Sequence, residues 1–237
     1  MLLLAGALLW FRAKSRQKAA VQFARIQEQE QGLNAVIQAT EDERRRIARD
    51  LHDGVGQELS SLFLGIDSIK SKIPEALVPG LNSLRERLGT STKHLRQISH
   101  QMMPQALETA GLAPALEDLV ATSFRNTTIT ARVDAFRVPD NLDPKVALVC
   151  YRVAQELLNN VIRHAGASEI DVMLIAKNDR INLSVEDNGK GFDPHQASEG
   201  IGLTNMRTRL KAVNGSLEYE QVDGKGTRAV VNVKCIV

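Results

Sequence analysis

The chain has 237 residues, of which 43% are hydrophobic and 24% are charged, and its formal net charge is +2. This composition is typical of a globular chain of one or two domains and excludes a largely disordered one. The near balance of charge argues against direct nucleic-acid binding, which concentrates basic charge on one face. Cys150 and Cys235 lie far apart with no CxxC or Cys/His spacing. A disulfide framework or structural zinc site is therefore not expected, and a reducing cytoplasm is the natural setting.

The first residues are apolar and are followed at once by basic ones. Residues 1–11 read MLLLAGALLWF, and the charges after them are Arg12, Lys14, Arg16 and Lys18. Such a helix reaches only about 16 Å, roughly half of a bilayer core. A secretory signal carries its positive charge before the apolar run. Residues 1–13 are therefore interpreted as the cytoplasmic end of a truncated transmembrane helix; the alternative is a buried or interfacial helix start without a membrane role.

Residues 14–104 are predicted to be helical. Residues 14–40 are rich in Gln, Glu, Ala and Arg, which favours a signalling helix or coiled-coil linker. Residues 41–104 then carry two apolar seams at helical spacing, one from Ile47 to Ile73 and one from Leu81 to Met102, with Pro74, Pro79 and Gly80 in the connecting loop. Because an αα-hairpin alone buries little apolar surface, we expect two chains to pair as a four-helix homodimer.

The first helix of this hairpin carries a candidate nucleophile. His52 lies one residue beyond the apolar Leu51, about 100° round the helix, so its side chain is expected to be exposed. The carboxylate of Asp53 is adjacent, and Gln57 follows one turn later. An imidazole with a base at its other nitrogen can attack a phosphoryl donor. A surface histidine taken alone is more often only solvated, so the assignment depends on a donor site elsewhere.

Residues 105–237 mix helix and strand patterns. Helices are predicted over 112–124 and 141–164, and the alternating segments predict strands over 128–134, 169–176, 180–187, 216–222 and 227–235. Strands on one side and helices on the other make an α/β sandwich. The predicted fold class is therefore α+β, a helical hairpin followed by an α/β sandwich domain.

The sandwich domain contains polar residues suited to a phosphate ligand. Glu156 and Asn160 share a helix face, where Asn160 can offer an oxygen to Mg²⁺ and Glu156 can orient water or accept a proton. Arg163 and His164 follow one turn later and can contact phosphate. ExxxN by itself is more often an ordinary polar face.

Glycine-rich segments follow the third predicted strand. Asp187 ends that strand and opens DNGKG, where a carboxylate can accept a hydrogen bond from an adenine amine. Gly189 and Gly191 permit backbone angles and close approach that a Cβ would block. The ordinary alternatives for these segments are turns and helix caps. Further on, Gly200 and Gly202 precede a helix that starts near Leu203, and the backbone N–H groups there can face phosphate. Gly226 and Thr227 open the last strand and can line the floor of a nucleotide site.

In order and residue type, these segments resemble the N, G1 and G2 boxes of the Bergerat-type (GHKL) ATPases, over residues 108–235. With ERRRIARDLHDGVGQ at 43–57, residues 40–235 resemble the sensor histidine kinases of the nitrate-sensor class. That class has an HD-x-x-x-Q signature, matched by His52, Asp53 and Gln57. The short stretch between Gly191 and Gly200 and the lack of a phenylalanine-rich box also fit it.

The resemblance implies an ATP-binding catalytic domain at 105–237 that phosphorylates His52 from ATP with Mg²⁺, while Asp53 takes or polarises a proton. It further implies transfer to the aspartate of a response regulator receiver domain, typically one with a helix-turn-helix output domain. Gln57 resembles the residue that orients water for dephosphorylating that regulator. The implied location is the cytoplasmic face of the cell membrane.

Two other functions compete with this one. An ATP-driven clamp or a serine kinase on the same ATP fold needs no phosphoacceptor helix, so the HD-x-x-x-Q hairpin argues against both. A Bergerat-fold dimerisation module that binds ATP without phosphotransfer is opposed by the intact Glu156, Asn160 and Asp187. The sequence leaves open whether His52 is phosphorylated within its own subunit or by its partner.

Overall fold

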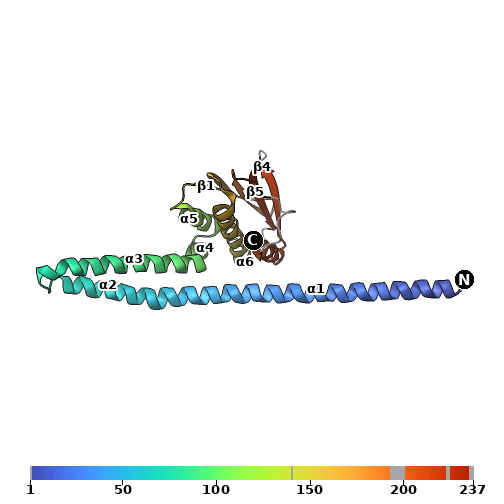
Figure 1. The fold of residues 1–237 in the computed structure, drawn as a ribbon, viewed down its shortest axis with the longest axis horizontal. Helices are drawn as coiled ribbons and strands as arrows, with labels where there is room; N and C mark the ends of the chain where they lie inside the picture. Colours follow the sequence, from blue (N-terminus) through green and yellow to red (C-terminus); the bar gives the residue numbers. More distant parts are fainter. Residues whose placement is uncertain (1, 140, 193–200, 223–224, 235–237) are drawn as a thin grey trace. The chain divides into compact units, whose positions relative to one another are not determined.

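The computed structural model describes residues 2–139, 141–192, 201–222 and 225–234 (Figure 1). The chain divides into two compact units, Met1–Ala39 and Thr40–Val237. The described part of the first unit is helical and belongs to α1 (Leu2–Asp50). Among the described residues, no helix combines the length and apolarity needed to cross a membrane.

The second unit begins with the predicted hairpin. The last turns of α1 lead through a short turn (Leu51–Val55) into α2 (Gly56–Lys70), and α3 (Val78–Met102) packs beside α2 (Figure 1). The connection differs from the sequence prediction, because it ends before Val78 and contains the 3₁₀ turn Glu75–Leu77. Pro79 lies inside the first turn of α3, where a helix does not need the missing N–H.

The turn that carries His52 is π-helical, which the seam of apolar residues did not predict. The Gly56 N–H donates to the Leu51 carbonyl, five residues back, in place of the usual four. Gly54 and Gly56 both lie in or beside this turn, and glycine has a low preference for regular α-helix. The chain nevertheless continues in the same direction, because Asp50 and Gly56 keep right-handed helical angles.

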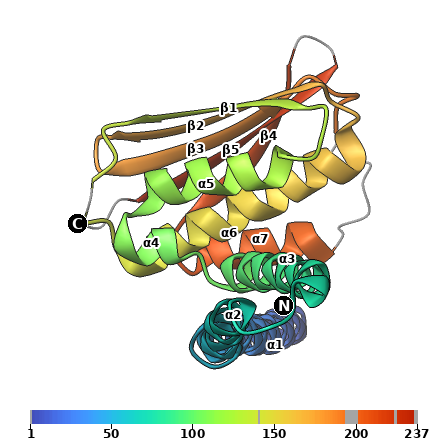
Figure 2. The same ribbon diagram turned by 90° about the vertical axis from the view of Figure 1, so that its left-hand side faces the viewer.

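The remainder of the second unit is a sheet covered on one face by helices (Figure 2). The strand order is β1-β2-β3-β5-β4, with β1 and β2 parallel and the other pairs antiparallel. The strands are β1 (Thr130–Phe136), β2 (Glu169–Lys177), β3 (Arg180–Asp187), β4 (Ser216–Val222) and β5 (Gly226–Lys234). The helices are α4 (Gln105–Thr109), α5 (Leu112–Phe124), α6 (Pro144–Asn160) and α7 (Ile201–Lys211).

This arrangement confirms the predicted fold class, with shifts at the element ends. The helix predicted from residue 141 begins at Pro144, because the Asp143 side chain caps it by accepting hydrogen bonds from the N–H groups of Lys145 and Val146. The core lies between helices and sheet, where Leu174, Leu183 and Val231 are fully buried.

Strand register brings the ends of β3 and β5 together. Asp187, the last residue of β3, pairs with Thr227 near the start of β5 and with Ile170 of β2. The loop that leaves β3 and the loop that enters β5 therefore meet at the same end of the sheet, close to the end of α6. Figure 2 shows α6 running under the strands between α5 and α7.

The hairpin leaves much of its apolar seam uncovered within one chain. Leu62, Ile69, Leu84 and Ile98 are 56%, 47%, 57% and 49% exposed. Four seam residues exposed on two neighbouring helices form the kind of apolar surface that a second chain covers.

We therefore expect Leu62→Lys to convert a dimer into a monomer, because a buried unpaired charge opposes association. Light scattering coupled to size exclusion would measure the molar mass. Ser68→Lys adds the same charge at an exposed polar position of α2 and should leave the dimer intact. A dimer that persists in the Leu62 variant would contradict this interface.

Candidate active site

A cavity of about 620 Å³ lies at the edge where β3 and β5 meet the end of α6 and the start of α7. The predicted residues that line it are Glu156, Asn160, Arg163, His164, Asp187, Gly191, Gly202, Leu203 and Thr227. Gly189 shapes the adjoining loop without lining the cavity, and Gly200 lies outside the described residues. The structure thus gathers residues from positions 156 to 227 into one site.

Asp187 is buried and lines this cavity. Its Oδ1 accepts a hydrogen bond from the Gly189 N–H at 2.8 Å. Burial raises the pKa of Asp187, the Gly189 hydrogen bond opposes that rise, and Glu186 adds to it. A buried side chain of this kind, placed at a cavity wall, can recognise a donor group on a ligand through a direct hydrogen bond.

The glycines around Asp187 are required mainly by neighbouring backbone. A Cβ on Gly226 would collide with the Asp187 carbonyl oxygen, and one on Gly189 with the Ala165 carbonyl oxygen. Gly191 has φ +84°, an angle that favours glycine. The close approach expected at Gly189 is therefore one between its loop and the backbone of the turn that follows α6, and a contact of Gly189 with a ligand stays a prediction.

Asn188 fixes the DNGKG loop, a role that the sequence prediction missed. Its side-chain oxygen accepts hydrogen bonds from the N–H groups of Ser168 and Glu169 at 2.9 and 3.0 Å, and its amide donates to Ser168 Oγ at 3.0 Å. The Lys190 N–H donates to the Ala165 carbonyl at 3.0 Å. The loop is thereby held against the start of β2, which keeps Asp187 in place.

One face of α6 supplies the polar wall. Glu156 and Asn160 both line the cavity, and the helix then widens into a second π-helical turn, Val161–Ala165, which carries Arg163 and His164. Gly166, with φ 62°, ends this turn. Among the described residues, no three His, Cys, Asp or Glu side chains form a metal-binding group. One asparagine oxygen with waters is the kind of coordination that Mg²⁺ accepts, because it keeps much of its hydration shell.

The cavity also has an aromatic and apolar wall that the sequence prediction did not include. Phe192 and Tyr219 pack edge to face with ring centroids 5.1 Å apart, and both line the cavity. Burial raises the pKa of Tyr219 to about 12, so its hydroxyl stays protonated. The alternating pattern of β4 showed that Tyr219 belongs to a strand but not that it faces a ligand. Such a wall suits a planar aromatic group beside a polar one.

His52 lies in a different cavity, of about 700 Å³, which Gln57 also lines. The His52 side chain is 58% exposed, as its place beside the seam predicts, and its Nδ1 lies 2.9 Å from Asp53 Oδ1. The described lining residues of this cavity all belong to the hairpin, and none lines the cavity at Asp187. The structure therefore pairs His52 with Asp53 and places Gln57 in the same cavity, but it does not join them to the predicted residues of the sandwich domain.

Comparison with known proteins assigns both parts. Residues 43–107 match the histidine kinase family, and residues 146–235 match the family of histidine kinase-, DNA gyrase B- and HSP90-like ATPases. The hairpin match contains His52 and Gln57, and the second match contains Asp187 and the cavity around it. The second domain is therefore of an ATP-binding type.

Curated relatives and a solved structure are similar to this chain. The sensor histidine kinase MctS of Rhizobium johnstonii is 37% identical over 77% of this chain and 41% of its own length. The signal transduction histidine-protein kinase/phosphatase DegS of Brevibacillus brevis is 30% identical over 84% of this chain and 53% of its own. The chain spans about half the length of these relatives. The histidine kinase domain of an Erythrobacter litoralis blue-light activated kinase gives a TM-score of 0.48 at 15% identity, covering 76% of this chain and 94% of that one.

Two family matches in succession, over the hairpin and over the sandwich, show that this chain belongs to the sensor histidine kinases, in the class that resembles the nitrate sensors.

Proposed function

We propose that this chain is the core of an ATP-dependent protein-histidine kinase that phosphorylates His52 and passes the phosphoryl group to an aspartate of a response regulator. The observation that carries the proposal is the exposed His52–Asp53 pair, with Nδ1 2.9 Å from the carboxylate, in a chain that also has an ATPase-type cavity. The family matches support both halves.

The pair supplies the nucleophile. A carboxylate at Nδ1 favours the tautomer with the proton on that nitrogen, which leaves the Nε2 lone pair free. Nε2 attacks the γ-phosphorus of ATP, the bond to the bridging oxygen breaks, and ADP leaves. Positive charge that develops on the ring is stabilised by Asp53. The phosphoryl group then moves from Nε2 to a regulator aspartate, which restores neutral His52.

The cavity holds the donor. Asp187 would accept a hydrogen bond from the adenine amine, and Phe192 and Tyr219, which line the same cavity, would pack on the ring. Arg163, His164 and Lys190 would contact phosphate, and Asn160 would hold Mg²⁺ with Glu156 orienting a metal-bound water. A bound Mg²⁺ supplies charge neutralisation on the phosphates.

A second activity, dephosphorylation of the regulator, is proposed for Gln57. Gln57 lines the same exposed cavity as His52, so a regulator docked at His52 also meets an amide able to orient water. The name of DegS, a kinase/phosphatase, describes both activities in that relative. We further propose a regulator with a helix-turn-helix output domain, and a location at the cytoplasmic membrane face on the basis of the apolar residues 1–11.

The alternative is an ATP-binding dimerisation module without phosphotransfer. The two cavities share no described lining residue, so the structure is also compatible with nucleotide binding alone. The exposed nucleophile beside its base favours the kinase, because a mere dimerisation helix has no need of that pair.

His52→Gln is expected to abolish incorporation of label from γ-labelled ATP, because the amide is not a nucleophile, while ATP affinity stays unchanged. The product in the wild type should be acid-labile and alkali-stable. His94→Gln, at another exposed histidine of the hairpin, serves as the matched control and should label normally. Persistent label in the His52 variant would disprove the nucleophile, and ATP binding without label in the wild type would favour the alternative module.

Asp187→Asn is expected to weaken ATP binding about 10- to 100-fold, since a hydrogen bond to a charged group contributes roughly 1.5–3 kcal/mol. Titration calorimetry with ATP would measure the dissociation constant. Glu186→Gln removes a charge one residue earlier, where the side chain pairs with Arg228 at 2.7 Å on the other face of the sheet. An equal effect of both variants would argue against a direct role for Asp187.

Gln57→Ala is expected to retain His52 labelling and to lose most of the acceleration of regulator dephosphorylation. The measurement is the decay of a phosphorylated receiver domain that accepts phosphate from this protein, with and without the variant. Glu58→Ala, the exposed neighbour, is the control. Undiminished phosphatase activity in the Gln57 variant would remove that residue from the reaction.

A further inference from the structure

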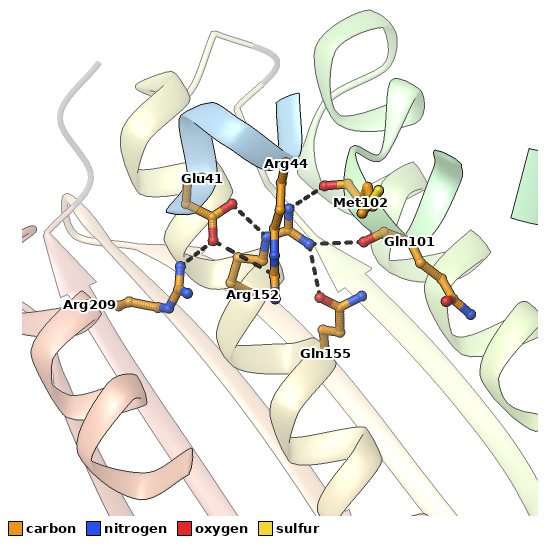
Figure 3. Close-up of polar contacts among 7 residues, drawn as sticks. All are labelled: Glu41, Arg44, Gln101, Met102, Arg152, Gln155 and Arg209. Carbon is orange, nitrogen blue, oxygen red and sulfur yellow. Dashed lines mark hydrogen bonds and ion pairs between the residues drawn. The ribbon is translucent and has the colours of Figure 1, made fainter. Parts of the chain in front are cut away.

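A buried ion cluster joins the hairpin to the ATP-binding domain (Figure 3). Glu41, in the part of α1 that leads to His52, lies between Arg152 of α6 and Arg209 of α7. Arg152 Nε is 3.0 Å from Glu41 Oε2, and Arg209 Nη1 is 2.5 Å from Glu41 Oε1. The side chains of Glu41 and Arg152 are 7% and 4% exposed. These three residues have no role in the phosphoryl transfer or the ATP binding proposed above.

Arg152 also ties the other helix of the hairpin to the same point. Its guanidinium donates to the backbone carbonyls of Gln101 and Met102 at 3.1 and 2.5 Å, and to the Gln155 side chain at 2.9 Å. One side chain of the ATP-binding domain thus contacts the start of the hairpin, through Glu41, and its end, through α3. Figure 3 shows these contacts converging on Arg152.

One carboxylate faces several guanidinium groups in this cluster, because Arg44 Nη1 also lies 3.9 Å from Glu41 Oε1. Burial acts to raise the pKa of Glu41, but Arg152, the hydrogen bond and charge of Arg209, and the charge of Arg44 together outweigh it and lower that pKa. Glu41 is therefore ionised at neutral pH. A buried ion pair need not add net stability, because each charge regains its hydration when the partners separate. Such a contact can hold one arrangement and still open.

The cluster lies on the helices that build both reactive sites. Arg152 lies one turn before Glu156 on α6, and α7 carries Gly202 and Leu203 at the nucleotide cavity with Arg209 about two turns further on. His52 follows Glu41 by about three turns along the same run of helix. In this docked position, the described residues around His52 and around the nucleotide cavity do not overlap.

We propose that Glu41, Arg152 and Arg209 form an interdomain latch that holds the ATP-binding domain docked on the hairpin with the nucleotide site withheld from His52. The latch rests on the proposed kinase function and adds a control point to it. Rotating α1 by one residue's turn, about 100°, would carry Glu41 away from both arginines. Movement of α1 is thereby converted into release of the ATP-binding domain.

The test compares Glu41→Gln and Arg209→Gln with Glu43→Gln in the full chain. Glu41→Gln keeps the shape of the side chain and removes its charge, whereas Glu43 is 53% exposed and pairs only locally with Arg46 among the described contacts. We expect each latch variant to raise the initial rate of His52 labelling several-fold at saturating ATP, with Glu43→Gln unchanged. The labelling rate of the double variant should be only slightly higher than that of the faster single variant, because both changes open the same contact.

A second readout does not depend on labelling. Donor and acceptor dyes at Arg87→Cys in α3 and Glu218→Cys in β4, with Cys235 replaced by Ser, report the distance between the two domains; mixing with excess undyed protein isolates the distance within one chain. Glu41→Gln and Arg209→Gln should lengthen or broaden that distance, and Glu43→Gln should not.

The outcomes separate the two proposals. If the wild type labels His52 but neither latch variant labels faster, the latch is overturned. If the wild type never labels, the kinase proposal fails, and the dye distance alone decides the latch. Unchanged distances in both latch variants overturn it in either case. Far-ultraviolet circular dichroism and ATP affinity, expected to be near wild type, exclude unfolding as the cause of a change.

Discussion

The nucleotide cavity depends on the close approach of three backbone segments around Asp187. The start of β5 passes the end of β3 so closely that only hydrogen fits at Gly226, and the DNGKG loop crosses the end of α6 with the same requirement at Gly189. Asn188 then fastens the loop to the start of β2. Because these contacts are between backbones, the side chain of Asp187 is left at the cavity wall, positioned by the fold and not by the ligand.

Sequence patterns predicted the features that depend on local periodicity. Strand alternation located β2 and β3 to within a residue or two, and the seam beside Leu51 predicted an exposed His52. The spacing of Glu156 and Asn160 likewise predicted their shared face. Each of these predictions depends on neighbours along the chain, where helix and strand geometry is fixed by the backbone alone.

Features that depend on distant residues could not be predicted in this way. Glu41 and Arg152 are 111 positions apart, and in the sequence Glu41 is one of many charges on a helix that looks solvated. The backbone that approaches Gly189 could not be predicted for a similar reason, because the Ala165 carbonyl comes from the turn after α6. The two π-helical turns could not be predicted either. Each adds a single residue to one helical turn, and a pattern of apolar residues spaced three or four apart does not reveal so small a change.

Both π-helical turns lie where chemistry is proposed, at His52 and at Arg163–His164. A wider turn changes the direction of the side chains beyond it, so it can turn a polar group toward a ligand while the helix on either side stays packed. On the hairpin, the result is a cavity whose described walls come from the hairpin itself. If the latch keeps the ATP-binding domain docked, that cavity stays open to a regulator, and Gln57 can act while ATP is withheld from His52. One contact between domains would then select between two opposing reactions at the same helix turn, without changing the residues of either site.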